Sequence, residues 1–250
     1  MPDPVAASPE LTTPALTEVQ RVVDTFTAPS KTFIDIRRKA TFWGPLVIMI
    51  LVAIGFSYGV QQKVTWERVF ENNLHQTPSR EEQLEKLPAE QQAPQRAIGA
   101  KVTSIITYCY PVLILIFTAI FALLVWVTVN FGFAGSSKYG QIFAVNMYAN
   151  LVVNLKFLLA IVALFAGLAP DSFLLQNPVG TNVGYYLSTD APKWLATLGQ
   201  HLDLFEIWSV ILTSIGVSIV ANVSRGKAAT AVVGWWLIFV LVGVGVAAAS

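Results

Sequence analysis

The chain has 250 residues, of which 54% are hydrophobic and only 12% are charged. Soluble domains carry roughly twice that charged fraction, so the composition excludes an ordinary soluble globule. The net charge of +1 gives no electrostatic basis for binding nucleic acid. The single cysteine, Cys109, cannot form an intrachain disulfide.

The amino-terminal segment divides into two parts. Residues 1–17 are rich in Pro, Ser, Thr and Ala, which predicts a disordered tail. In residues 18–41, apolar side chains recur at helical spacing on either side of a break at Pro29. We therefore predict two short amphipathic helices, which either lie on the membrane surface or pack against the protein's own helices.

Long apolar stretches dominate the rest of the chain. A hydrocarbon core of about 30 Å requires about 20 apolar residues in a helix. The predicted spans are about 42–60, 102–129, 142–167, 205–223 and 228–249. Their lengths do not fit barrel strands of about ten residues. The sequence thus predicts an all-α fold, a polytopic membrane helix bundle of about five transmembrane helices within residues 42–249, with amino-terminal interfacial helices. Pro111 is expected to kink the second span.

The placement of Lys and Arg predicts the orientation, because these residues accumulate next to spans on the cytoplasmic side. Two residues, Lys63 and Lys101, adjoin the spans on one side. The other side holds Arg37, Arg38, Lys39, Lys138, Arg225 and Lys227. This asymmetry predicts a cytoplasmic amino terminus and a carboxyl terminus outside.

The third span carries an unusual polar set. Asn146, Asn150 and Asn154 are spaced four apart and share one helix face. Lys156 lies deep in the same span, where a charge costs at least about 2.5–3.5 kcal/mol. The asparagines could line a conduction path, or they could bond neighbouring helices while Lys156 snorkels or pairs with a carboxylate. Lys156 lies about 200° around the helix from Asn154, which argues against a single polar channel.

Two carboxylates open the fourth span. Asp203 and Glu206 have the spacing of a capping box, in which the first side chain accepts from helix amides and the second reaches back. The functional alternative is an acidic cluster that meets a partner or pairs with Lys156.

The sequence offers no catalytic pattern. The motifs HExxH, CxxC and GxSxG are absent. His75 and His201 are lone histidines whose spacing gives no serine, carboxylate or cysteine partner. We therefore predict no catalytic, cofactor or metal site, and no enzymatic activity.

Four ordered segments carry a resemblance to a known family. They are FTAPSKTFIDIRRK leading into FWGPL, FGFAGSSKYGQIFAVNMYANL, LDLFEIWSVILTSIG and SRGKAATAVVGWW. Together they resemble bacterial members of the Yip-domain family, over roughly residues 18–248. The family's eukaryotic relatives are five-span proteins that interact with Rab GTPases. The resemblance implies a cytosolic amino terminus, a role in membrane organisation without catalysis, and, for a bacterial protein, the inner membrane.

Two functions follow as hypotheses. The first is a membrane scaffold that works through helix packing and through lipids, other membrane proteins or copies of itself. It predicts that the face of Asn146, Asn150 and Asn154 packs against other spans. The second is a small transporter or channel, which predicts a water-filled cavity that reaches Lys156.

Overall fold

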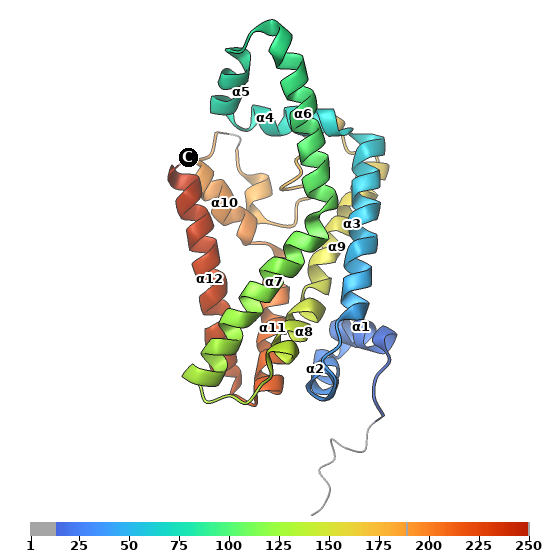
Figure 1. The fold of residues 1–250 in the computed structure, drawn as a ribbon, viewed down its shortest axis with the longest axis vertical. Helices are drawn as coiled ribbons and strands as arrows, with labels where there is room; N and C mark the ends of the chain where they lie inside the picture. The colour runs from blue at the N-terminus through green and yellow to red at the C-terminus, as the bar shows by residue number, and fades with distance from the viewer. Residues whose placement is uncertain (1–13, 189, 250) are drawn as a thin grey trace, which may run out of the picture.

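The computed structural model describes residues 14–188 and 190–249, and these form an all-α bundle (Figure 1). In chain order the α-helices are α1 (Glu18–Thr27), α2 (Pro29–Arg38), α3 (Trp43–Lys63), α4 (Trp66–His75), α5 (Pro78–Glu85), α6 (Ala89–Tyr108), α7 (Tyr110–Val127), α8 (Tyr139–Ala149), α9 (Leu151–Phe165), α10 (Lys193–His201), α11 (Leu204–Ala221) and α12 (Arg225–Ala249). A π-helical turn, η2 (Thr128–Gly132), extends α7, and two short 3-10 turns, η3 (Pro170–Ser172) and η4 (Val183–Tyr186), lie between α9 and α10. The predicted tail falls mostly on residues 1–13, which lie outside the described residues.

Five of the described segments are long and apolar enough to cross a membrane. They are Trp43–Lys63, Tyr110–Gly132, Tyr139–Phe165, Leu204–Ala221 and Arg225–Ala249. Much of each segment stays uncovered by the rest of the chain, and only 22% of the apolar stretch in Tyr110–Gly132 is buried. Apolar surface of this extent is compatible with lipid and not with water. The prediction of an all-α polytopic bundle with five membrane helices is confirmed.

One helix break directly precedes the second span, and another lies within the third. α6 ends at Tyr108, and after the single residue Cys109 the chain re-enters a helix as α7, with Pro111 in its first turn. The apolar segment therefore begins at Tyr110, eight residues after the predicted position 102. α8 and α9 meet at Asn150, whose ψ of −8° interrupts the helix and was not predicted.

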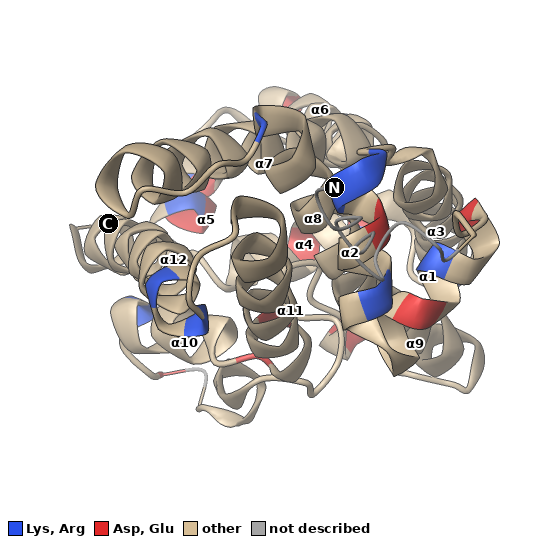
Figure 2. Cartoon of the chain, turned by 90° about the horizontal axis from the view of Figure 1, so that it is seen from below, with Lys and Arg blue, Asp and Glu red and all other residues tan. Residues whose placement is uncertain are grey.

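The loops divide between two ends of the bundle. Figure 1 places α1, α2 and the α7–α8 and α11–α12 connections at one end, with the α4–α5–α6 hairpin, α10 and the carboxyl terminus at the other. Figure 2 looks onto the first end and shows segments of Lys and Arg, coloured blue, on α2 and on neighbouring elements. The basic residues assigned by sequence to the cytoplasmic side thus belong to elements at one end.

The two amino-terminal helices pack against the bundle. Phe33 and Ile36 on α2 are completely buried, in a core shared with Val145 of α8 and Val217 of α11. α1 has an exposed apolar face, on which Val19 and Val23 are 73% and 53% exposed. α2 therefore packs against the protein's own helices, while α1 presents apolar side chains outward.

Gly216 permits the close approach of α11 to α8 and α2. A Cβ atom there would lie 2.4 Å from Val145 Cγ1 and 3.0 Å from Phe33 Cδ1. We expect Gly216→Ala to cost about 1–3 kcal/mol of unfolding free energy, because an added methyl forces packed helices apart. Thermal unfolding in detergent measures the effect. Gly234→Ala is the matched control, since a Cβ at Gly234 meets nothing within 4 Å. Equal melting temperatures for the two variants would contradict the prediction.

Candidate functional site

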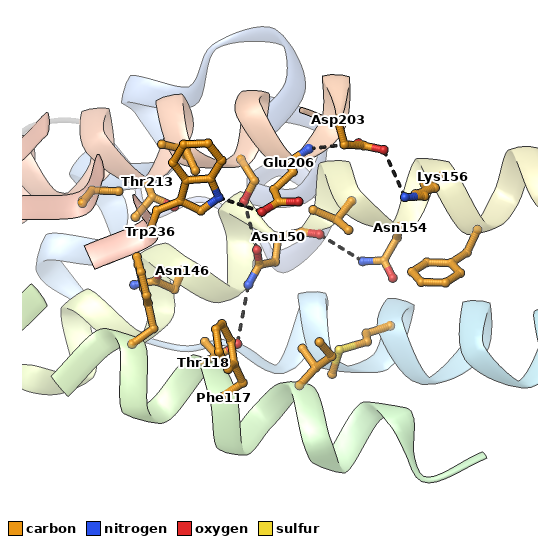
Figure 3. A pocket seen from close by; sticks show the side chains of 18 of the residues that line it. Phe117, Thr118, Asn146, Asn150, Asn154, Lys156, Asp203, Glu206, Thr213 and Trp236 are labelled. Atoms are coloured by element: carbon orange, nitrogen blue, oxygen red, sulfur yellow. Dashed lines mark hydrogen bonds and ion pairs between the residues drawn. The ribbon is translucent and has the colours of Figure 1, made fainter. Parts of the chain in front are cut away.

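A cavity of about 230 Å³ lies between the spans, and its wall includes all six candidate residues. They are Asn146, Asn150, Asn154, Lys156, Asp203 and Glu206. Figure 3 shows how side chains from the third, fourth and fifth spans converge there, with α7 closing the opposite side. Lys156 and Asn154 border the same cavity despite their offset around the helix. The angle describes where each side chain starts, whereas the long lysine side chain extends into the space that Asn154 also faces.

Asn150, at the break in the third span, bonds to two other spans. Its Oδ1 accepts from Ser209 Oγ of α11 at 2.9 Å, and its Nδ2 lies 3.5 Å from Thr118 Oγ1 of α7. The other two asparagines turn their amide nitrogens to their own helix. Asn146 donates to Ile142 O at 2.8 Å, and Asn154 donates to Asn150 O at 3.3 Å. One member of the predicted stripe therefore joins spans, while the other two bond locally.

Lys156 and Asp203 form an ion pair at the rim of the cavity. Lys156 Nζ lies 3.0 Å from Asp203 Oδ2, and the two side chains are 15% and 3% exposed. Asp203 also caps α11, since its Oδ1 accepts from the amides of Phe205 and Glu206. Burial by itself raises the pKa of the Asp203 carboxyl, but hydrogen bonds from Thr181 and Lys156 outweigh it and hold the pKa below its ordinary value. Capping and the pairing with Lys156 thus occur together.

Glu206 does not complete the predicted capping box. Its Oε1 accepts from Trp236 Nε1 on α12 at 2.6 Å and lies 3.0 Å from His201 Nδ1 on α10. The hydrogen bond to Glu206 raises the pKa of His201, against a smaller opposing effect of burial. Sequence spacing left His201 without a partner, because the turn at residue 202 between α10 and α11 brings residues five apart face to face.

A second cavity, of about 370 Å³, adjoins the first. The two share Asn154, Lys156 and Glu206 in their walls. The second cavity also reaches Gln176, an exposed residue of the α9–α10 loop at the end away from α1. The space around Lys156 therefore extends toward that end of the bundle.

Sequence reasoning missed a charged cluster at the opposite end. Arg21 of α1 is 2% exposed, and its Nε lies 2.6 Å from Asp35 Oδ2 of α2. Glu18 accepts from Thr41 at 2.5 Å and from the Tyr148 hydroxyl of α8, also at 2.5 Å. The only available signal was the spacing of Glu18 and Arg21, three apart within an amphipathic pattern. This cluster ties α1 and α2 to the third span.

A scan against protein-family models matches residues 23–247 to the Yip1 domain. The chain belongs to the Yip1 domain family. Neither the curated proteins nor the solved structures contain a match. The matched region covers four of the candidate spans completely, the fifth as far as residue 247, and all six candidate residues in the cavity wall. Glu18 and Arg21 precede the matched region. Within the part of this Yip1 domain that the structure describes, no cluster of three His, Cys, Asp or Glu side chains could hold a metal ion.

Proposed function

We propose that the chain is a non-enzymatic membrane scaffold that works through helix packing and through lipid or membrane-protein partners, including copies of itself. The supporting observation is the bonding of Asn150 to Thr118 and Ser209, because it uses a half-buried amide to join three spans. The Yip1 domain family is one without enzymatic activity, which favours this proposal over catalysis.

The proposed setting is a bacterial inner membrane, with the amino terminus in the cytoplasm and the carboxyl terminus outside. The location of Lys138, Arg225 and Lys227 on elements at the α1–α2 end supports this orientation under the positive-inside rule. The exposed Val19 and Val23 on α1 would then face the inner leaflet, where an apolar helix edge is stabilised by lipid.

A second candidate, a small transporter or channel, is favoured by one specific observation. The adjoining cavities provide space from the exposed Gln176 as far as Lys156 and Asn146. A path for a solute would have to continue from there to the α1–α2 end. At that end Asn146 is 4% exposed and Ile142 is completely buried, which favours the scaffold.

Cysteine labelling separates the two functions. In a Cys109→Ser background, single cysteines replace Asn146, Asn150, Asn154 and Lys156, and a membrane-impermeant thiol reagent is applied from either side. For the scaffold, we expect no labelling at position 146 or 150 from the cytoplasmic side, because the packed spans at the α1–α2 end exclude a water-soluble reagent there. Gln176→Cys serves as the positive control for the outer side. Labelling of position 146 from the cytoplasmic side would contradict the scaffold and support the transporter.

A further inference from the structure

The wall of the first cavity holds two carboxylates, Asp203 and Glu206, and one lysine, Lys156. Asp203 is saturated, since its Oδ2 accepts from Lys156 and Thr181 while its Oδ1 accepts from two helix amides. The Lys156 charge is thereby matched by its neighbour. Glu206 then remains as the carboxylate whose counter-charge depends on His201 alone. With a neutral imidazole, the cavity carries one net negative charge.

Glu206 is placed to act on something inside the cavity. Its side chain is 31% exposed, and Figure 3 shows the carboxylate between Trp236 and Asn150, facing the hollow. Trp236 donates one neutral hydrogen bond, which stabilises a carboxylate without cancelling its charge. An anion withdrawn from water is costly unless a cation is supplied nearby. The site is therefore completed either by a proton on His201 or by a positively charged ligand.

The remaining wall has the composition that attracts organic cations. Aromatic rings from three spans border the cavity, and they belong to Tyr110, Phe117, Phe121, Phe157 and Trp236. The faces of such rings carry negative partial charge and attract ammonium groups within about 6 Å. Asn154 adds an amide oxygen, since its nitrogen is engaged with Asn150 O. The combination of aromatic rings and a single carboxylate is more favourable for an alkylammonium group than for a hydrated metal ion.

We propose that the cavity binds a small organic ammonium cation, with Glu206 as its counter-ion and the aromatic rings around it. This inference goes beyond the scaffold role and does not depend on it. A volume of about 230 Å³ lies below the range of about 300–1,000 Å³ for drug-sized ligands, so the group held is a small one. Its source is a free amine, or the ammonium headgroup of a lipid.

Binding of the ammonium cation and protonation of His201 both depend on the Glu206 carboxylate, so the two compete. The charged and titratable groups that face this pair are Lys156 of α9, Asp203 at the start of α11 and Tyr110 of α7. Because Glu206 raises the pKa of His201, a cation bound at Glu206 must lower it again. Below that pKa the imidazolium neutralises Glu206 and the ligand binds weakly. Above it the ligand binds more tightly, so affinity rises as the pH increases through the His201 titration.

The test uses the full chain in nanodiscs of phosphatidylglycerol, which carries no ammonium group. Choline and its neutral isostere 3,3-dimethyl-1-butanol are titrated, and calorimetry together with tryptophan fluorescence reports binding. We expect choline to bind at least about tenfold more tightly than the isostere. Glu206→Gln should abolish that preference. Glu67→Gln, a change to an exposed carboxylate of α4, should leave it intact.

Two further variants test the proposal independently of Glu206→Gln. If Glu206→Gln fails to fold, Phe117→Leu is the second variant, because it keeps an apolar side chain and removes one aromatic ring. The affinity for choline should then fall severalfold, while the affinity for the isostere stays the same. His201→Gln should flatten the pH dependence. Equal binding of choline and the isostere, or binding of inorganic phosphate in place of choline, would overturn the proposal.

A final experiment, in which the lipid composition is changed, identifies the source of the ammonium group. Adding phosphatidylethanolamine to the nanodiscs should weaken the apparent affinity for choline if a lipid headgroup occupies the site. An unchanged affinity assigns the site to a free amine. Both results require the carboxylate of Glu206, so each supports the proposal only if Glu206→Gln removes the binding of choline.

Discussion

Lys156→Met is expected to destabilise the protein by about 3–5 kcal/mol, because it leaves the Asp203 carboxylate buried without its counter-charge. The two groups lie 3.0 Å apart, and both are largely buried. Asp203→Asn should have a comparable effect through the opposite defect, a buried ammonium without a carboxylate. Asparagine still caps the α11 amides, so this change isolates the charge from the cap. The free energy of unfolding is measured by denaturant titration in mixed micelles.

The double variant decides whether the two side chains act as a pair. Lys156→Met combined with Asp203→Asn should recover much of the stability lost in either single variant, because neither unpaired charge remains. Lys101→Met is the control, since Lys101 is exposed on α6 and its loss should change the unfolding free energy by no more than about 0.5 kcal/mol. Additive losses in the double variant would show that the pair is not coupled.

Arg21→Met should destabilise the attachment of α1 and α2 by about 3–5 kcal/mol. The guanidinium is almost fully buried between Asp35 and Glu18, so its removal leaves Asp35, which is 4% exposed, without a partner. Because the cluster lies at one end, we expect proteolytic cleavage between α1 and α3 to appear before the spans unfold. Limited proteolysis in nanodiscs, with unfolding measured in parallel, provides the readout.

The control for this experiment is Lys31→Met, which removes a charge from an exposed position of α2.

Low pH should reproduce part of the loss of stability that Arg21→Met causes. Burial raises the pKa of Glu18, but hydrogen bonds from Thr41 and Tyr148 outweigh it and the net pKa is lowered. Glu18 therefore contributes stability above its unfolded pKa of about 4.3, and that contribution is lost as the pH falls through the folded value. Protection of α1 that is unaffected by Arg21→Met would refute the prediction.

Hydropathy and segment length were sufficient to predict the five membrane helices, because each apolar stretch is compatible with lipid on all faces and needs no knowledge of its neighbours. The break at Asn150 could not be predicted in the same way. An asparagine within an apolar run gives no local signal of a kink, and its partners Thr118 and Ser209 lie 32 and 59 residues away.

The candidate site was predicted in part. Pairing of Lys156 with Asp203 was one of the alternatives, since a lysine in hydrocarbon needs an acidic neighbour. The pairing of His201 with Glu206 was missed because it depends on the turn between α10 and α11. The Arg21 cluster was missed because the approach of Tyr148 to Glu18 is set by tertiary packing alone. A functional role for the six cavity residues stays a prediction.

The single-residue break at Cys109 joins the α4–α5–α6 hairpin directly to the wall of the first cavity. α6 packs closely on α4, since a Cβ atom at Gly99 would lie 2.2 Å from the Phe70 ring. Only Cys109 separates α6 from α7, and α7 carries Phe117 and Thr118 of the cavity wall (Figure 1). A change in the direction of α6 would therefore have to be absorbed in the backbone of Cys109 or be passed on to these two wall residues.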